Sequence, residues 1–564
     1  MSDKTEAAKE LIKKYGPNKV LDSMWAKYLA VTSKDELSVA TSLVTSPEQL
    51  EAIQRRHLPA NNEKDFLTID WLRRRIAEVD DPALKSYWAI DADGHTPALC
   101  APAQCYRALI NSVVAVSVQS NLQIGYGWKD EVHFISNYAQ LLRDLQKRSN
   151  VQLHLVSLNS EMTVYLERWE LEDNVLVAPR TNPVTRKIYL DSPTAAPFLE
   201  TPGKEISELY TLPLAEECTF DVDVVYTWVN SEDPDWQEML AAHTEVPETD
   251  EESDSTENQR ESAAADGDGE TVEEDDVDED RYLSRDELKY SLRSLLEFAP
   301  WVRRVYIVSN CKPPEWFDEK NKRVKWVYHE EIIEAEHLPT FSSHAIEASV
   351  HRIPGLSEHF LYFNDDLFLL KPVKKSDFFL PNGLAKTRPE PYGMVHGEVD
   401  PEHADYLNAA RNVQGLLEKE FGKTVTKLHT HSPQSMKLSV VQACEETFPE
   451  AYERTRANRF RAVTDISPTS FMYPNFAYLT GEAVMEYPVT ALVNVSKPFK
   501  RTLNSYIEAM KSGNVDALPL TLCINDGGGS SQNQDWSAAV IRFMSFVFNE
   551  MSEAERTFGS LTQD

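Results

Sequence analysis

The chain has 564 residues, of which 41% are hydrophobic and 26% are charged, and its formal net charge at pH 7 is −34. This length allows about two to four domains, and the acidic balance argues against a nucleic-acid-binding protein. No stretch approaches about 18 uninterrupted apolar residues, and the amino terminus is charged where a secretory signal is apolar, so we expect neither a transmembrane helix nor a signal peptide. The six cysteines form no CxxC pair, which is typical of reduced thiols in a cytosolic protein.

The amino-terminal part of the chain carries no motif that points to chemistry. Residues 1–62 alternate helical patterns with breaks, and we interpret them as an N-terminal helical region. Residues 63–215 combine a helical pattern with β-prone runs between residues 151 and 193, which predicts a mixed α+β accessory region.

The negative charge is concentrated in one segment. From Glu245 to Asp280 there are 18 acidic residues and one basic residue, Arg260, so this segment carries half of the net charge. It is rich in Ser, Thr and Ala and lacks aromatic residues, which predicts a disordered acidic insertion at 242–281. The insertion would interrupt a catalytic domain spanning 216–550, followed by a flexible tail at 551–564.

Strand and helix patterns alternate from residue 221 onward. Ser284 and Glu287 have the spacing of a capping box, which predicts the start of an amphipathic helix that ends at Pro300. The expected elements are a strand at 221–230, this helix, strands at 303–310 and 323–329, a helix at 343–353 and a strand from 359. This order predicts an α/β fold with a mainly parallel sheet flanked by helices.

The last of these strands ends in two adjacent carboxylates. An apolar run from Phe360 to Phe363 stops at Asn364, Asp365 and Asp366. Burying two carboxylates is costly unless a cation pairs with them, and open α/β sheets bind ligands beyond the carboxyl ends of their strands. A divalent metal carrying a phosphorylated substrate would explain the pair, and a polar turn is the alternative.

The helix expected before this strand has a polar face. His344, Glu347 and His351 recur at helical spacing. They could line an active site, with Arg352 available to a phosphate as a bidentate donor, or they could simply face solvent.

A segment rich in histidine and arginine follows. His429 and His431 precede Ser432-Pro433, which predicts a helix start that suits acid–base chemistry and attracts anions. Four arginines then fall within eight residues: Arg454, Arg456, Arg459 and Arg461. They indicate an anionic ligand, although pairing with nearby glutamates on a surface helix is an equal alternative.

A second strand with an acidic end lies near the carboxyl terminus. The run LTLCIND ends at Asn525 and Asp526, and the glycines 527–529 follow before another helix. A glycine-rich turn between strand and helix can bring backbone amides to a phosphate, and a plain flexible loop is the alternative.

Together these segments resemble the Stealth family of sugar-phosphate transferases, which includes bacterial capsule polymerases and the lysosomal-enzyme GlcNAc-1-phosphotransferase. Four blocks follow the order of the family: DVDVVYTWVN, the long segment RDELKYSLRSLLEF through HFLYFNDDLFLLKPV, HTHSPQSMKLSVVQ through RTRANRFR, and LCINDGGGSSQNQDW. All lie after residue 220, so the resemblance implies nothing for the amino-terminal region, the acidic insertion or the tail.

The resemblance implies transfer of a sugar-1-phosphate, such as N-acetylhexosamine- or hexose-1-phosphate, from a UDP-sugar to a glycan hydroxyl. UDP-GlcNAc is a common donor in the family. UMP leaves and a phosphodiester forms, as in capsular or cell-surface polysaccharide synthesis. Phosphoryl transfer depends on charge neutralisation and in-line positioning, which implies Mg²⁺ or Mn²⁺ as cofactor. The expected location is the cytoplasm, and peripheral attachment to the export machinery at the inner membrane stays open.

The resemblance also implies roles for individual residues. The metal ligands are Asp365, Asp366 and Asp526, with Asp366 also counted as catalytic. The expected substrate-binding residues are Asp223, Asn230, His344, Glu347, Arg352, Asn364 and Asn525. Either His431 or His429 would deprotonate the acceptor, and Arg459 and Arg461 would hold the diphosphate.

Two other functions are alternatives. A metal-dependent glycosyltransferase also places an acidic pair at a strand end, but it releases UDP instead of UMP. The third possibility is a non-catalytic carbohydrate-binding or scaffolding protein with this fold, and the intact acidic, histidine and arginine positions argue against it.

Overall fold

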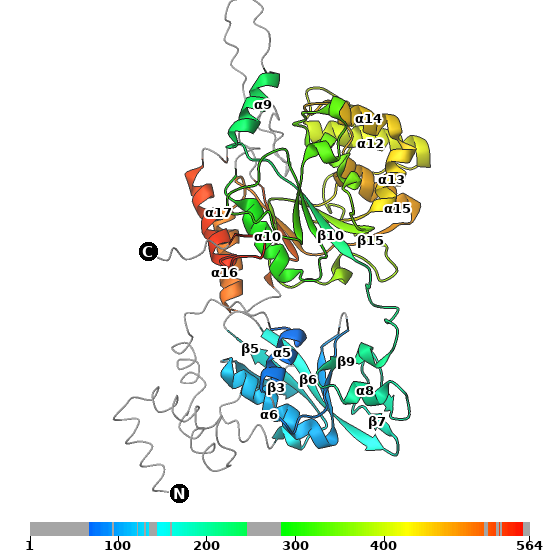
Figure 1. The fold of residues 1–564 in the computed structure, drawn as a ribbon, viewed down its shortest axis with the longest axis vertical. Helices are drawn as coiled ribbons and strands as arrows, with labels where there is room; N and C mark the ends of the chain where they lie inside the picture. The colour runs from blue at the N-terminus through cyan, green and yellow to red at the C-terminus, as the bar shows by residue number, and fades with distance from the viewer. Residues whose placement is uncertain are drawn as a thin grey trace, which may run out of the picture. The chain divides into compact units, whose positions relative to one another are not determined.

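The structure is a computed structural model, and it describes most of the chain from residue 67 to residue 556. The residues outside the description are 1–66, 80, 93–94, 121, 129–130, 135–143, 158–160, 245–283, 513–516, 526–529, 531–532 and 557–564. The predicted helical region at 1–62, most of the acidic insertion, Asp526 and the glycine turn therefore lie outside the described residues. The chain divides into two compact units: unit 1 extends to Leu214 and includes 508–517, and unit 2 comprises the remainder from Ala215 (Figure 1).

Unit 1 is built on a mixed sheet with the strand order β4-β3-β5-β6-β2-β1-β9, extended by β7 and β8. Its strands are β1 (Trp88–Ile90), β2 (Ala98–Pro102), β3 (Gln123–Trp128), β4 (Glu131–Phe134), β5 (Asn150–Val156), β6 (Glu161–Glu172), β7 (Val175–Val177), β8 (Lys187–Tyr189) and β9 (Lys204–Glu205). Its helices among the described residues up to Leu214 are α5 (Ile69–Val79), α6 (Ala103–Gln119) and α8 (Ala195–Leu199). The strands expected between residues 151 and 193 are thus present as β5 to β8.

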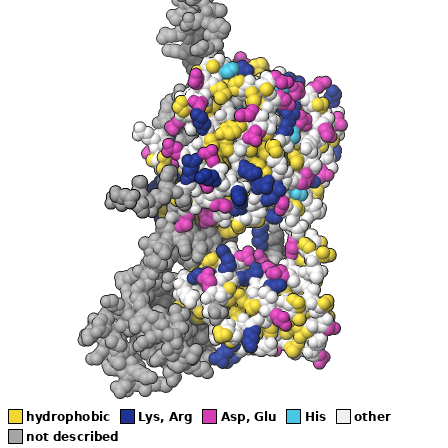
Figure 2. All heavy atoms as spheres, viewed as in Figure 1, with side chains coloured by type: hydrophobic (Ala, Val, Ile, Leu, Met, Phe, Trp, Pro, Cys, Tyr) yellow, Lys and Arg dark blue, Asp and Glu magenta, His cyan; other side chains and the backbone are white. Residues whose placement is uncertain are grey.

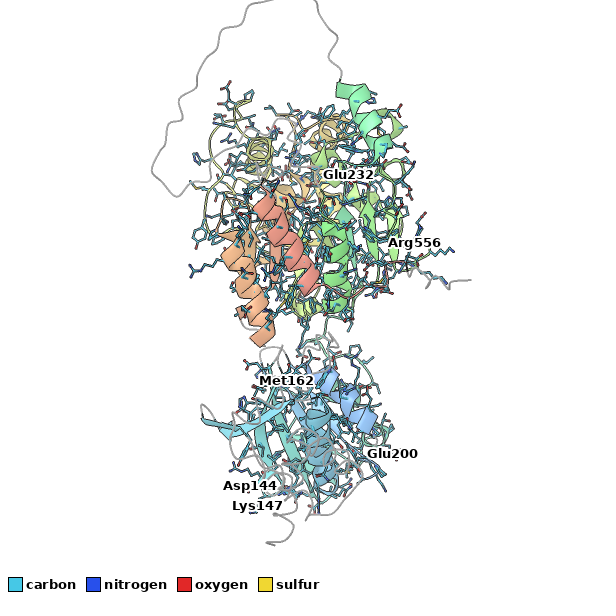
Figure 3. The ribbon with its side chains drawn as sticks, turned by 90° about the vertical axis from the view of Figure 1, so that its left-hand side faces the viewer. Asp144, Lys147, Met162, Glu200, Glu232 and Arg556 are labelled. Atoms are coloured by element: carbon cyan, nitrogen blue, oxygen red, sulfur yellow. The ribbon has the colours of Figure 1, made fainter. Side chains whose placement is uncertain are left out.

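The helices of unit 1 pack on the sheet through spacing that the sequence displays. Ile69, Leu72 and Ile76 are buried at one face of α5, as a helical period requires. Burial alternates along β5, so Val151 and Leu153 join the core that α5 and α6 cover. Figure 3 labels Met162 at the start of β6 in this unit.

Unit 2 contains a five-stranded sheet with the order β12-β11-β10-β13-β16. The strands are β10 (Val222–Thr227), β11 (Val305–Val308), β12 (Val324–Val327), β13 (His359–Asn364) and β16 (Gln434–Lys437). The first four are parallel, and β16 runs antiparallel to β13. The core of β10, β11 and β13 is continuously buried, as expected for parallel strands with both faces covered.

The strand that ends in the acidic pair continues into a second sheet. After Asn364 the chain turns at Asp365-Asp366 and enters β14 (Leu367–Leu369). β14 pairs antiparallel with β19 (Thr521–Ile524), which pairs in parallel with β18 (Thr490–Val493). The expected strand near 520–526 is therefore present, but it belongs to this smaller sheet.

The other elements of unit 2 complete its helical and strand layers. They are α9 (Pro234–Thr244), α10 (Glu287–Phe298), α11 (Ser343–Glu347), α12 (Asp405–Phe421), α13 (Leu438–Thr447), α14 (Pro449–Ala457), α15 (Tyr473–Thr480), α16 (Phe499–Ser512), α17 (Gln534–Val547), β15 (Ala385–Thr387) and β17 (Ala483–Met485). α16 spans the division between the units. No helix among the described residues is both long and apolar enough to cross a membrane. On the face drawn in Figure 2, basic and acidic side chains lie interspersed over unit 2.

Two predicted helix boundaries and one predicted boundary of the acidic insertion were wrong. The capping box at Ser284 does not form: Asp286 adopts a left-handed conformation with φ of 66°, so α10 begins at Glu287, whose carboxylate accepts from the Arg285 amide. The helix expected at 343–353 breaks after α11 and resumes as a short 3₁₀ turn. The acidic insertion also begins later than 242, because α9 runs to Thr244.

The helix expected to start at Ser432-Pro433 is absent. Residues 434–437 instead form β16, and α13 begins only at Leu438. Strand pairing overrides the local capping signal, because β16 pairs with the backbone groups at the otherwise free edge of β13, with Gln434 opposite Tyr362.

The first part of the predicted flexible tail is packed. Glu555 is buried and pairs with Arg293 through two contacts of 2.8 and 2.6 Å. The Asp318 amide donates to the carbonyl of Ala554 at 2.9 Å. Arg556, labelled in Figure 3, pairs with Glu319, so residues 551–556 belong to unit 2.

Candidate active site

Three segments that are distant in the sequence converge at the carboxyl end of β13. Asn364 lies opposite Thr227, the last residue of β10. The amide of Ile524, at the end of β19, donates to the carbonyl of Asp366 at 3.0 Å. Because β16 is antiparallel to β13 and starts at Gln434, His431 precedes it at the same edge of the sheet. The structure therefore brings the acidic pair, the end of β19 and the histidine segment together.

The carboxylate of Asp366 is held by side chains from β19 and the residue after it. Its Oδ2 atom accepts from the Cys523 thiol at 3.1 Å and from Nδ2 of Asn525 at 3.5 Å. Burial raises the pKa of Cys523 well above its usual value, and the negative charge of Asp366 raises it further, so this thiol remains a donor. Asp365 follows β13 directly, and its charge, after the larger effect of burial, helps raise the pKa of Tyr226.

The chemistry of these donors fits a hard divalent cation that also binds phosphate. Asp365 and Asp366 offer carboxylate oxygens, which Mg²⁺ prefers, and Mg²⁺ commonly takes one or two protein carboxylates and completes its shell with water and substrate phosphates. Within the described residues, no three His, Cys, Asp or Glu side chains are grouped to hold a metal by themselves. The third expected ligand, Asp526, lies outside the described residues.

Glu347 reaches the same edge of the sheet through Tyr362. The Tyr362 hydroxyl lies 2.9 Å from Oγ1 of Thr227 and donates to Oε1 of Glu347 at 3.3 Å. Thr469 donates to the other carboxylate oxygen of Glu347 at 2.6 Å. The end of α11 is thus tied to the ends of β10 and β13 by a chain of hydroxyl groups.

The two candidate histidines have different environments. His429 is 7% exposed, and its Nδ1 atom lies 2.8 Å from the carbonyl of Thr430. Burial lowers the pKa of His429 to about 3, so its ring is neutral at pH 7 and accepts a proton poorly. His431 is exposed. Of the two, His431 has the access that a general base for an acceptor hydroxyl requires.

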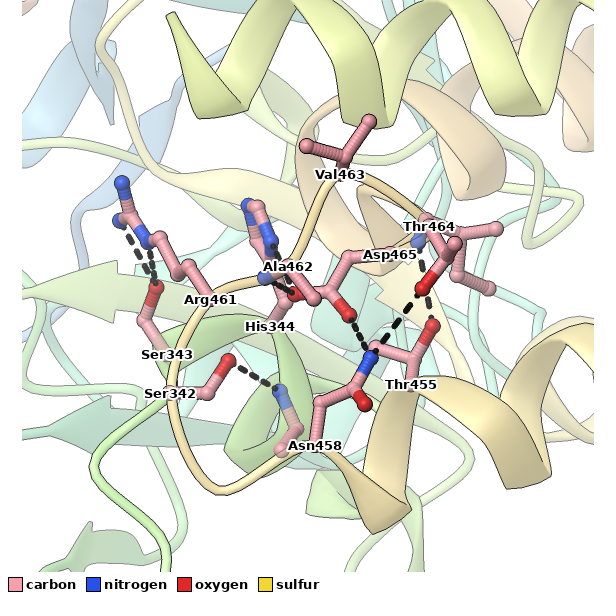
Figure 4. A network of polar contacts seen from close by, with 12 residues as sticks. Ser342, Ser343, His344, Thr455, Asn458, Arg461, Ala462, Val463, Thr464 and Asp465 are labelled. Carbon is pink, nitrogen blue, oxygen red and sulfur yellow. Dashed lines mark hydrogen bonds and ion pairs between the residues drawn. The ribbon is translucent and has the colours of Figure 1, made fainter. Parts of the chain in front are cut away.

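Arg459 and Arg461 lie on the loop between α14 and the next helical turn (Figure 4 shows Arg461). Nε and Nη2 of Arg461 donate to Oγ of Ser343 at 3.2 and 2.8 Å. Nε of Arg459 donates to the carbonyl of Pro339 at 3.0 Å. Both arginines therefore lie beside the segment that leads into α11.

Arg456 and the more distant Arg352 form internal ion pairs, whereas Arg454 is exposed and its Nε atom donates to the carbonyl of Thr464 at 3.2 Å. Arg456 is 3% exposed and lies 2.7 Å from Glu445, which also contacts His351 at 2.6 Å. Arg352, expected to meet a phosphate, instead pairs with Glu334 and Glu445 at 2.5 and 3.0 Å. Burial of Glu445 alone would raise its pKa, but His351 and the two arginines hold it at about 2. For Arg456 and Arg352, pairing with nearby glutamates is the interpretation that the contacts support.

His344 contacts a carboxylate that the sequence pattern did not single out. His344 is buried, and its Nδ1 atom lies 3.2 Å from Oδ2 of Asp465. The break in the predicted helix separates it from His351, so the expected polar face of three residues does not exist. An isolated aspartate after an arginine-rich segment carries no distinctive pattern, and Asp465 is found only through its contacts.

The two residues expected from the first strand occupy opposite ends of it. Asp223 lies near the amino end of β10, where its carboxylate accepts from Nε and Nη2 of Arg303 at 2.9 and 2.5 Å and from the Ser357 amide at 2.8 Å. The acidic pair lies at the carboxyl end, so this placement does not agree with a pocket role for Asp223. Asn230 does follow the carboxyl end of β10, and its Oδ1 atom accepts from the amide of Glu232 (labelled in Figure 3).

Comparison with known proteins identifies the class of molecule. Models of Stealth protein conserved regions 1, 2 and 3 match residues 220–242, 281–387 and 430–478. The capsular polysaccharide phosphotransferase SacB of Neisseria meningitidis serogroup A is 38% identical over 466 residues, which is 82% of this chain and 81% of that protein. The exopolysaccharide phosphotransferase SCO6021 of Streptomyces coelicolor is 37% identical and covers 61% of this chain and 62% of its own. A crystal structure of the galactosyltransferase LgtC aligns with 47% of this chain and 92% of its own at 9% identity, but the TM-score of 0.27 is too low to bear on fold or function.

These relatives define the molecule as an enzyme of the phosphotransferase class. The chain belongs to the Stealth family, as the resemblance of its sequence blocks predicted.

Proposed function

We propose that this enzyme transfers a sugar-1-phosphate from a UDP-sugar to a hydroxyl group of a glycan acceptor, in the synthesis of a capsular or other cell-surface polysaccharide. The relatives named above act in capsular and exopolysaccharide phosphate transfer, which supports the substrate class. The observation that carries the proposal is the convergence of Asp365-Asp366, Asn525 and the His431 segment at one sheet edge.

In the proposed reaction His431 takes the proton of the acceptor hydroxyl. The acceptor oxygen then attacks the phosphorus nearest the sugar, a new P–O bond forms, and the P–O bond to UMP breaks. Arg459 and Arg461 bind the diphosphate and stabilise the negative charge that the leaving UMP gains. His429 supports the backbone before His431 rather than acting as the base, because its ring is buried and hard to protonate.

Asp365 and Asp366, joined by Asp526, would hold Mg²⁺ or Mn²⁺. When bound, such an ion supplies positive charge that neutralises the diphosphate and orients it for in-line attack. Asn364 and Asn525 lie beside the two carboxylates, where their amides can bind sugar or phosphate oxygens. Besides these two asparagines, Glu347 is a candidate to bind sugar hydroxyls, since Tyr362 links it to the carboxyl end of β13.

We further propose that the reaction takes place in the cytoplasm, at or near the inner face of the membrane. The six cysteines are unpaired thiols, and five of them are buried, which suits a reducing compartment. UDP-sugars and a growing polysaccharide would both be available there.

A glycosyltransferase that releases UDP is the second candidate, because an acidic pair at a strand end also suits a metal-bound UDP-sugar. The two reactions are separated by the fate of the phosphate next to the sugar. Incubation with UDP-sugars labelled at that phosphate, Mg²⁺ and glycan acceptors should yield UMP and labelled glycan. Labelled UDP and unlabelled glycan would establish the second candidate, and no nucleotide release from any donor would exclude both.

A further inference from the structure

The loop that carries Arg459 and Arg461 ends at a fully buried carboxylate. Asp465 has 0% exposure, and it closes the segment that begins at Asn458 (Figure 4). A charge buried to this extent is costly unless several donors satisfy it. The donors that contact Asp465 therefore show which segments its carboxylate connects.

Three donors from two different segments converge on Asp465. Nδ2 of Asn458 donates to Oδ1 at 2.6 Å, and the amide of Ala462 donates to Oδ2 at 3.0 Å. Nδ1 of His344, on α11, lies 3.2 Å from the same Oδ2 atom. The first two contacts shape the loop, and the third joins the loop to α11 (Figure 4).

The contacts of Asp465 and the contact of Arg461 both connect the arginine loop to α11. Ala462 directly follows Arg461, and His344 directly follows Ser343. The guanidinium of Arg461 donates to Ser343 Oγ, while Asp465 links the two residues next in sequence. Two adjacent cross-links thus determine where the arginine backbone lies relative to α11.

The backbone of Arg459 is tied to the same segment. The amide of Phe341 donates to the carbonyl of Arg459 at 2.7 Å, and the rings of Phe341 and Phe460 stack with centroids 5.3 Å apart. Arginine side chains have many rotamers, so a rigid backbone reduces the entropy lost when they bind a diphosphate.

We propose that Asp465, acting through His344 and the Ala462 amide, is a positioning residue that holds Arg461 in place for the donor diphosphate. The inference rests on the proposed function, since it assumes that Arg461 binds the donor. It also assigns His344 a supporting contact behind the arginine loop instead of direct contact with the sugar.

The test measures donor and acceptor KM separately in Asp465→Asn, which removes the charge and keeps the side-chain size. Losing one charge-assisted contact should raise the KM for the UDP-sugar about tenfold and leave the acceptor KM unchanged. His344→Gln removes only one of the three contacts and should produce a smaller change in the same constant, so it serves as a second variant if Asp465→Asn does not fold. Glu555→Gln is the matched control, because it also removes a buried carboxylate charge, but that carboxylate pairs with Arg293 and lies in the packed segment 551–556.

A double-mutant cycle with Arg461→Ala identifies the route of the effect. If Asp465 acts through Arg461, Asp465→Asn should add little to the donor KM of Arg461→Ala. The proposal is overturned if the two substitutions raise the donor KM by independent factors that multiply in the double variant. It is also overturned if Asp465→Asn lowers thermal stability as Glu555→Gln does but leaves the donor KM unchanged. If the wild-type enzyme turns over no UDP-sugar, the proposed function fails separately. Calorimetric binding of UDP then decides this inference, and equal dissociation constants for wild type and Asp465→Asn overturn it.

Discussion

The thiol of Cys523 lies 3.1 Å from Oδ2 of Asp366, and this contact joins β19 to the turn after β13, 157 residues apart in the sequence. Asp366 occupies the turn where the chain leaves the main sheet, and Cys523 lies on the central strand of the smaller sheet. The contact fixes one oxygen of Asp366, and Asp365 follows β13 directly at the same turn. The two adjacent carboxylates therefore have distinct surroundings although their sequence context is nearly the same.

Asp365→Ala and Asp366→Ala should each lower kcat by about 10² or more, because the charge of the diphosphate would no longer be neutralised in the transition state. Circular dichroism and thermal melting should show little loss of fold. Asp400→Ala, which removes a partly exposed carboxylate in a loop, serves as the control. Near-normal turnover in a folded Asp366→Ala enzyme would refute its assignment to the metal.

His431→Gln should lower kcat by about 10² to 10⁴, the range expected when a general base is removed. His429→Gln should cost far less activity, since the His429 ring is buried, with a pKa of about 3. Single-turnover rates at saturating donor measure the chemical step for both variants. An equally large loss in a stably folded His429→Gln enzyme would reverse the assignment of the base.

Asp223→Ala should lower the free energy of unfolding by about 3 kcal/mol, because it removes the partner of Arg303 and the acceptor of two backbone amides. Urea unfolding measures the change. We expect the KM for the donor to stay within about twofold, since less than 0.5 kcal/mol of binding energy is then involved. A large increase in donor KM with unchanged stability would support the original prediction that Asp223 binds the substrate.

Acid should destabilise this protein through two buried histidines, His329 and His429. Burial lowers the pKa of His329 to about 4 and that of His429 to about 3, whereas an unfolded histidine titrates near about 6.5. Between these values the unfolded state binds more protons, so the free energy of unfolding falls as the pH drops below about 6.5. Between pH 7 and pH 5 the free energy of unfolding of the wild type falls, and His329→Leu should make this decrease smaller by about 2 kcal/mol.

Urea titrations at the two pH values test this expectation. His396→Gln, at an exposed position, should leave the difference between pH 7 and pH 5 as it is in the wild type. If His329→Leu shows the full wild-type difference as well, burial of His329 does not contribute to acid sensitivity.

Local patterns predicted well wherever short-range periodicity decides the outcome. Continuous apolar runs predicted β10, β11 and β13, and their order predicted the parallel part of the sheet. The same patterns predicted poorly where a distant partner competes. Ser432-Pro433 has a good helix-start signal, yet the free edge of β13 recruited residues 434–437 as a strand.

The amino-acid sequence by itself determined the parallel strands β10, β11 and β13, the acidic end of β13 and membership of the Stealth family. Only the tertiary structure decided which ionisable groups meet: Asp223 pairs with Arg303, Arg352 pairs with Glu445, and Asp465 contacts His344. The physical reason is the sequence separation over which each kind of interaction acts. Side-chain periodicity and capping act over a few residues, whereas ion pairing depends on strand order and register, which bring together residues that are tens to hundreds of positions apart.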